Sequence, residues 1–363
     1  MIRSLVTGGA GFIGSHLVRH LLATGHHDDQ VVALDDLSGG FIQNLPRDPR
    51  LHFVEGSIVD NRLVDGLFDK HRFDHVYHLA AYAAEGLSHF IRRFNYTNNV
   101  IGSVNLINAS IMHDVKCFVF TSSIAVYGEG QSPMLETMTP RPEDPYGVAK
   151  FAIEMDLQAA GRLHGLNHVI FRPHNVYGEY QNIGDKYRNV VGIFMNQILE
   201  GRPLSIFGDG TQQRAFSYVG DIVSPMVRCT SMPGTFGQIY NIGADQPYSV
   251  NALAQAVISV MDIDSHPIVH LDPRDEVHVA YSDHSKVRQT FGQSAVTPLG
   301  VGLEKMARWV RESGSRQSQE FSNIEVPRNL PASWVRTDQQ AVKPIAPAAI
   351  QSPVSVSSNL AID

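Results

Sequence analysis

The feature that most constrains the fold is a glycine-rich segment near the start of the chain, TGGAGFIG at positions 7–14. It follows an apolar run typical of a buried β-strand, and helical spacing begins right after it, over Ser15–Leu22. Gly8 permits a tight turn, Gly11 lets the backbone approach a pyrophosphate, and Gly14 lets the helix pack closely on the strand. The start of such a helix offers free N–H groups and partial positive charge to phosphates. This context favours dinucleotide binding over a plain glycine turn.

An acidic residue ends the next apolar run and indicates which dinucleotide binds. Val31–Leu34 leads directly into Asp35, about twenty residues after the glycine motif. A carboxylate there can accept hydrogen bonds from the adenosine ribose and would repel a 2′-phosphate. The sequence therefore predicts NAD as the cofactor in preference to NADP.

Alternation of short apolar runs with helical segments sets the fold class. Six runs are predicted strands: Ser4–Thr7, Val31–Leu34, His52–Glu55, His75–Leu79, Lys116–Thr121 and His168–Arg172. Helical patterns between them, such as Val100–Ile111, predict an α/β fold with a doubly wound parallel sheet. From Pro173 the pattern loosens, and the composition after Ser313 is typical of a tail.

These changes along the chain predict a division into interleaved parts. We expect a dinucleotide-binding domain over 1–172 with a return segment near 215–243. A smaller substrate domain would comprise 173–214 and 244–314, and 315–363 would be a C-terminal extension that is largely tail.

Composition excludes several classes of function. The 363 residues hold 29 Lys plus Arg against 36 Asp plus Glu, a formal net charge of −7, which argues against general nucleic-acid binding. Apolar runs are too short for a membrane span, and the start lacks a signal-peptide pattern, so a cytoplasmic protein is expected. The two cysteines, Cys117 and Cys229, are expected to be packed thiols. His71, His75 and His78 do not converge in the predicted elements, and no catalytic metal is expected.

A tyrosine and a lysine one helical turn apart form the candidate catalytic pair. Tyr146 and Lys150 share one helix face, where an ammonium can lower the pKa of the phenol and make it a usable base. Ser122 and Ser123 follow a predicted strand, and open α/β sheets bind ligands at that end of their strands. Ser123 could thus share a substrate oxygen with Tyr146. The spacing of Tyr146 and Lys150 and the serines after the predicted strand indicate the same crevice. Together they favour a catalytic role over a Tyr–Lys pair that faces solvent.

With these motifs in place, the chain resembles the extended short-chain dehydrogenases/reductases, specifically the NAD-dependent nucleotide-sugar epimerase/dehydratase family. Besides TGGAGFIG, the matching segments in family order are HLAA (78–81), NVIGS (99–103), TSSIAVYG (121–128), PYGVAK (145–150), FRPHNVYG (171–178), FGDGTQQRAFSYVGDI (207–222) and SDHSK (282–286). Within the family it is most like 4-epimerases of UDP-glucose and UDP-N-acetylglucosamine. The resemblance implies a Rossmann-type fold and NAD.

The resemblance also implies roles for individual residues. Those at the cofactor would be Gly8, Gly11, Phe12, Ile13, Gly14, Asp35, Asp36, Ser38, Gly39, Ser57, Ile58, Leu79, Ala80, Ala81, Asn99, Ser122, Tyr146, Lys150 and Pro173. Ser123, Tyr146 and Lys150 would be catalytic. Those at the substrate would be Glu85, Ser123, Tyr146, His174, Asn175, Val191, Phe194, Ile206, Phe207, Arg214, Arg274 and Ala280. Arg214 and Arg274 would clamp phosphates, a role that suits a guanidinium fork.

The residues after Ser123 discriminate between the reactions of the resembled family. Its 4,6-dehydratases have an acid and a base there, whereas this chain has Ile124 and Ala125, which cannot move protons. The resemblance therefore implies a 4-epimerase acting on a UDP-sugar through a transient 4-keto intermediate. A dehydratase using Glu85, and a non-catalytic NAD-binding sensor or scaffold, remain alternatives.

Four positions depart from the pattern of the resembled family. Ser57 replaces an acid that often contacts adenine, His174 stands where an aromatic residue is common, and Ala215 replaces an aspartate. The segment around Arg274 is one residue short, so the role of Arg274 is less firmly implied than that of Arg214.

Two further expectations concern the sugar and the assembly. Ala280 aligns with a family position beside the C2 substituent of the sugar, and its small side chain implies room for an N-acetyl group. A homodimer is common in the family, and the predicted helices Val100–Ile111 and Phe151–Leu163 could form its interface.

Overall fold

The computed structural model describes residues 1–130, 132–273, 277–292, 296–318, 321, 323–331 and 334. Arg274 lies outside this set. The chain divides into two compact units, Met1–Glu325 and Val326–Asp363. Residues 315–325, which the sequence places in the C-terminal extension, belong to the first unit. The interleaved division into two domains stays a prediction.

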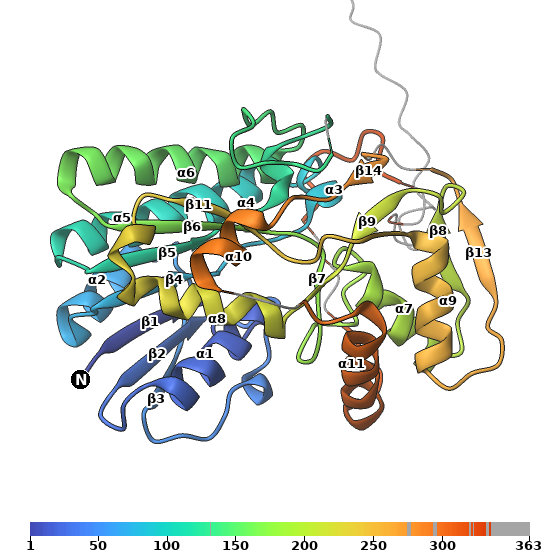
Figure 1. Ribbon diagram of the computed structural model, residues 1–363, viewed down its shortest axis with the longest axis horizontal. Coiled ribbons are helices and arrows are strands. Elements are labelled where there is room, and N and C mark those ends of the chain that lie inside the picture. The colour runs from blue at the N-terminus through green and yellow to red at the C-terminus, as the bar shows by residue number, and fades with distance from the viewer. Residues whose placement is uncertain are drawn as a thin grey trace, which may run out of the picture. The chain divides into compact units, whose positions relative to one another are not determined.

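A seven-stranded parallel sheet forms the centre of the first unit (Figure 1). Its strands are β1 (Arg3–Thr7), β2 (Gln30–Asp35), β3 (Leu51–Glu55), β4 (His75–His78), β5 (Cys117–Thr121), β6 (His168–Pro173) and β11 (Ile239–Ile242). Their spatial order is β11-β6-β5-β4-β1-β2-β3, so the chain winds outward in both directions from β1 and β4. This confirms the predicted doubly wound sheet, whose near-continuous apolar strands are buried on both faces.

Helices cover both faces of this sheet (Figure 1). One face carries α2 (Asn61–His71), α5 (Gly102–Met112) and α6 (Pro145–His164). The other carries α1 (Phe12–Thr24), α8 (Gly220–Arg228) and α10 (Ser285–Phe291). Leu5 and Phe118 face the first layer and Val6 and Val119 the second, as the alternation of side chains along a strand requires.

A second group of elements encloses its own apolar core. Helices α7 (Val190–Leu199), α9 (Val250–Val260) and α11 (Leu299–Ser313) pack with β8 (Leu204–Phe207) around residues such as Leu253 and Leu303. Strand β13 (Ile268–Leu271) pairs with β8, and β9 (Gln213–Ala215) lies between β12 (Pro247–Ser249) and β14 (Val279–Ala280). The pair β7 (Val176–Tyr177) and β10 (Ser217–Tyr218) completes the strands.

Short helices lie along the connections that follow β4 and β5. They are α3 (Glu85–Ser88), α4 (Arg92–Tyr96), a π-helical turn over Thr97–Ile101 and a 3₁₀ turn over Ile124–Val126. Three further 3₁₀ turns are Ile42–Asn44, Cys229–Ser231 and Pro233–Thr235. No helix among the described residues is long and apolar enough to cross a membrane.

Candidate active site

The carboxyl ends of β1 and β4 are tied to each other and to α5 by a buried chain of polar side chains. His78 Nδ1 lies 2.8 Å from Thr7 Oγ1, and His78 Nε2 lies 2.8 Å from Ser103 Oγ. The Thr7 hydroxyl also accepts the N–H of Ala80 at 3.2 Å. Because parallel strands end at the same edge, these bonds bring the segment Leu79–Ala81 beside the glycine-rich turn.

The glycine-rich turn has the form that a pyrophosphate requires. A Cβ at Gly14 would lie 2.0 Å from the carbonyl oxygen of Gly8, so only glycine fits there. Helix α1 starts after Gly11, and no side chain caps its first N–H groups. Phe12 and Ile13 supply the first of these groups, which are the usual donors to a phosphate.

Asp35 lies at the end of β2, where the sequence predicts it, and is bonded to the loops around it. Its carboxylate accepts the N–H of Ala10 at 3.0 Å and that of Leu37 at 2.8 Å. Burial raises the pKa of Asp35, and the negative charge of Asp36 raises it further against these backbone bonds. Asp36 is exposed and accepts the N–H of Ser38 at 3.0 Å. Asp36, Ser38 and the adjacent Gly39 line the rim next to the glycine-rich turn.

Asn99 holds the segment that follows β4. Its side chain is buried, accepts the N–H of Tyr82 at 2.8 Å and donates to the Tyr82 carbonyl at 3.2 Å. Asn99 lies in the π-helical turn, a local widening that often marks functional sites. Ser57, beyond β3, accepts the N–H of Val59 at 3.3 Å, and Ile58 is buried against α5.

Ser123, Tyr146 and Lys150 are brought together at the end of β5. Ser123 is close enough to the Tyr146 phenol to lower its pKa, and Lys150 Nζ lies 5.8 Å from the centre of the Tyr146 ring. The ammonium donates to the Thr121 carbonyl at 2.8 Å. Two elements far apart in sequence thus present one acid–base group, as the spacing of these residues predicts.

The pKa values of this group differ from the sequence-based expectation. Burial raises the pKa of Tyr146, and the charge of Glu85 raises it further, while the bond to Ser123 and the charge of Arg188 act in the opposite direction. Burial lowers the pKa of Lys150 to about 7, although Glu154 partly offsets this. The expected lowering of the pKa of Tyr146 by Lys150 is therefore not seen, because burial and the charge of Glu85 raise this pKa.

A buried ion pair behind this group escaped the sequence analysis. Glu154 and Arg172 are fully buried and form a bidentate pair. Ser122 Oγ donates to Glu154 Oε1 at 2.5 Å. Glu154 lies one helical turn after Lys150, and that spacing is the signal that could have revealed it.

Residues after β6 lie close to β9. Pro173 ends β6, and His174 and Asn175 both contact the Ala215 carbonyl, at 3.0 Å from His174 Nδ1 and 3.2 Å from Asn175 Nδ2. The guanidinium of Arg214 donates to the carbonyls of Gln213, Val277 and His278. The structure thus brings His174 and Asn175 to the residue that follows Arg214, while Arg274 lies outside the described residues.

The remaining predicted substrate residues fall into two groups. Val191, Phe194 and Ile206 are buried in the core around α7 and β8, and only Phe207 is partly exposed, so contact with a base would fall to Phe207 and the backbone. Ala280 packs against Ile124 beside the catalytic group. Glu85 begins α3, is exposed, and acts electrostatically on Tyr146.

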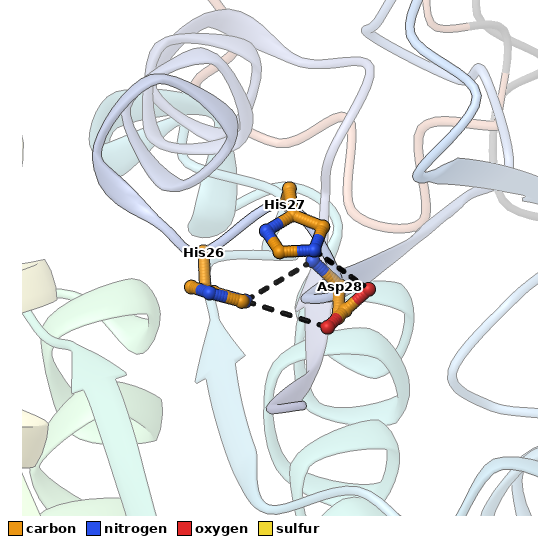
Figure 2. Close-up of side chains that lie close together, drawn as sticks. All are labelled: His26, His27 and Asp28. Atoms are coloured by element: carbon orange, nitrogen blue, oxygen red, sulfur yellow. Dashed lines mark hydrogen bonds and ion pairs between the residues drawn. The ribbon is translucent and has the colours of Figure 1, made fainter.

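One group of potential metal ligands occurs among the described residues. Figure 2 shows His26, His27 and Asp28 clustered at the turn between α1 and β2. All three are exposed, and the turn precedes β2, at the sheet edge opposite the catalytic group. It has no connection to the site, and the absence of a catalytic metal stays a prediction. Cys117 and Cys229 are buried free thiols, as the sequence predicts.

Comparison with known proteins gives the family. Residues 4–243 match the NAD dependent epimerase/dehydratase family. The chain belongs to this family. It is 35% identical to a UDP-glucose 4-epimerase of Mycolicibacterium smegmatis, over 85% of this chain and 99% of that protein. It is 31% identical to a dTDP-D-glucose 4,6-dehydratase of Mus musculus, over 86% and 89% of the two chains.

A solved structure supports the same assignment. The crystal structure of UDP-glucose 4-epimerase from Thermotoga maritima with UDP-glucose superposes with a TM-score of 0.80 at 34% identity. The match covers 86% of this chain and 99% of that one. This member of the NAD-dependent epimerase/dehydratase family therefore has the family's fold and uses NAD, as predicted from the glycine-rich turn and Asp35.

Proposed function

We propose that this family member is an NAD-dependent 4-epimerase of a UDP-sugar. The observation that carries the proposal is the content of the site: Ser123 is close enough to Tyr146 to act on its pKa, Lys150 lies beside the Tyr146 ring, and Ile124 and Ala125 follow Ser123. Such a site can oxidise and reduce a hydroxyl-bearing carbon. The two side chains after Ser123 carry no proton that an elimination could use. The epimerase relative and the UDP-glucose complex support the same reaction.

In the proposed reaction Tyr146 removes the proton of the C4 hydroxyl, and Ser123 hydrogen-bonds to the same oxygen. The residues proposed to hold NAD are the glycine-rich turn, Asp35, Asn99 and Lys150, whose free N–H groups and carboxylate suit a pyrophosphate and a ribose. NAD, when bound, would take the hydride from C4 and return it to the 4-keto sugar after that sugar turns over in its pocket. Tyr146 returns the proton to the C4 oxygen. No further acid or base is needed.

The dehydratase relative makes elimination the competing reaction. Glu85 is near enough to Tyr146 for its charge to raise the pKa of the phenol, so a carboxylate is available at the rim of the site. An elimination would use it to move a proton to or from a carbon. This outcome is distinguishable by its product.

Product analysis in deuterated water tests the proposal. The protein is incubated with UDP-glucose, UDP-N-acetylglucosamine and UDP-glucuronic acid, and products are read by NMR. Epimerisation should invert C4 without incorporating solvent deuterium, because the hydride returns directly. A dehydrated keto product carrying deuterium would overturn the proposal in favour of the dehydratase.

The hydroxyl of Tyr146 should be indispensable. Tyr146→Phe should lose about 10²–10⁴-fold in kcat, the contribution of a positioned general base. Tyr96→Phe, a change of the same chemistry in α4, is the matched control and should retain activity. Full activity of Tyr146→Phe would refute the mechanism.

We further propose that Ala280 leaves room for an N-acetyl group. The proposal is supported by the buried cluster that Ala280 shares with Ile124, the residue after Ser123. Ala280→Tyr should lower kcat/KM for UDP-N-acetylgalactosamine more than for UDP-galactose. An unchanged ratio of the two values would exclude this role.

A further inference from the structure

Two histidines stack on each other behind the end of β6. His174 is 3% exposed and His284, which precedes α10, is 1% exposed. Their rings are 5.1 Å apart at an interplanar angle of 17°. The Nε2 atoms lie 3.1 Å from each other. At this distance the two nitrogens form a hydrogen bond only if one carries a proton and the other does not.

The outer nitrogens of both rings face acceptors. His174 Nδ1 lies 3.0 Å from the Ala215 carbonyl oxygen, and His284 Nδ1 lies 2.7 Å from Asp245 Oδ1. Since neither oxygen can donate while Asp245 is ionised, each Nδ1 must carry a hydrogen. With the bond between the rings, the chain of contacts needs three hydrogens, whereas two neutral imidazoles supply only two. Together with the 3.0 Å contact of Ser282 Oγ with His284 Nε2, all of these contacts can be hydrogen bonds at once only if the pair holds one additional proton.

His174 is the ring of the pair that stays neutral. Burial lowers the pKa of His174 to about 3, and the neighbouring His284 adds to the effect, so His174 is neutral. Burial opposes ionisation of Asp245, but its bonds and charge interactions with His284 and Arg288 lower its pKa below the usual value. Asp245 is thus the counter-ion of His284.

Other polar groups near the pair are already bonded. Ser282 Oγ lies 3.0 Å from His284 Nε2. Asp283 accepts from Ser285, Lys286 donates to the Ile239 carbonyl, and Arg172 is paired with Glu154. The backbone of Gly243 lies against the His174 ring, because a Cβ at Gly243 would be only 2.7 Å from His174 Nε2.

We propose that Asp245 and His284 are positioning residues that hold His174 and Asn175 in place. They do so only while the histidine pair keeps its additional proton. Nucleotide-sugar binding is therefore linked to that proton. This rests on the proposed function, which assigns Asn175 and Arg214 to the substrate. Loss of the proton leaves two lone pairs facing each other at 3.1 Å. His174 then shifts, and with it the Ala215 carbonyl that also anchors Asn175.

Kinetics across pH 5.5–9.5 test the linkage. KM for the UDP-sugar should rise about three- to tenfold as the proton leaves at higher pH, the equivalent of one lost hydrogen bond. In Asp245→Asn the rise should move to lower pH, because the imidazolium loses its counter-ion. His284→Phe keeps a stacked ring without a titrating nitrogen and should show no such rise. His168→Phe, a buried histidine at the start of β6, is the control and should behave as the wild type.

Two outcomes would overturn the proposal. The first is a KM of the wild type that does not rise with pH. The second is a rise of KM with pH that persists unchanged in His284→Phe. A purely structural role for His284 would lower activity at every pH alike and leave the shape of the pH profile unaltered.

A measurement without turnover separates this proposal from the proposed function. ¹⁵N NMR of histidine-labelled protein, assigned with the His174→Phe and His284→Phe variants, should show one imidazolium and one neutral ring. Calorimetry should show that UDP binding weakens over the same pH range. Two neutral rings in an active epimerase would refute the proton linkage alone. An inactive protein with the imidazolium and pH-dependent UDP binding would refute the proposed reaction alone.

Discussion

Lys150 is a buried lysine that makes the free energy of unfolding of the protein depend on pH. It contacts the Thr121 carbonyl and lies 4.8 Å from the centre of the Phe120 ring, and burial lowers its pKa to about 7. In the unfolded chain a lysine titrates near 10.4. Between these two values the unfolded chain binds more protons than the folded one, so this residue makes the protein more stable as the pH rises.

Lys150→Met should therefore raise the free energy of unfolding of the NAD-free protein at neutral pH and below, because the cost of burying the ammonium is removed. The advantage of the variant over the wild type should shrink as the pH rises from about 7 toward 10. Urea unfolding at a series of pH values measures it. A constant difference across this range would show that burial does not depress the pKa of Lys150. The same variant should lose catalysis, since the proposed reaction uses the ammonium.

At the scale of elements, the start of α6 couples helix stability to catalysis. Asp144 is its N-cap and accepts the N–H groups of Tyr146 and Gly147 at 2.9 and 3.0 Å. Pro145 occupies the first position of the helix, which fixes the turn further. Tyr146 is thereby placed by the same bonds that begin the helix.

Asp144→Ala should cost about 1–2 kcal/mol in stability and should also lower kcat, because Tyr146 loses its backbone anchor. Asp60 is the matched control: it caps α2 by accepting the N–H of Leu63 at 3.1 Å, away from the site. Asp60→Ala should lose similar stability and keep kcat. Equal loss of kcat in both variants would indicate a general effect of stability and contradict the coupling.

At the scale of the whole molecule, exposed apolar side chains gather on the predicted dimer helices. On α6 they are Val148 (40% exposed), Met155 (56%) and Leu163 (78%), and on α5 Ile101 at its start (52%) and Met112 (77%). Helices α5 and α6 lie side by side on the same face of the sheet (Figure 1). Such a concentration of exposed apolar groups is typical of an interface.

We expect a second copy of the chain to cover this face. Met155→Arg should convert the dimer to a monomer in light scattering coupled to size-exclusion chromatography, since a buried unpaired charge is costly. Val301→Arg, which changes an exposed valine of α11 in the same way, should leave the dimer intact. A wild-type protein that is monomeric at micromolar concentration would refute the dimer.

The sequence by itself determined the doubly wound sheet and the cofactor, and it predicted that Ser123, Tyr146 and Lys150 lie close together. Each of these depends on local pattern: strand–helix alternation, glycine spacing before a helix, and residues one helical turn apart. Only the tertiary structure decided the pairing of Glu154 with Arg172 and of His174 with His284, and the burial of Val191 and Phe194 in the core. Hydrogen bonds, charges and burial of this kind depend on distances between segments far apart in the chain. The packing of helices on the central sheet and of the second core around α7, α9 and α11 sets those distances.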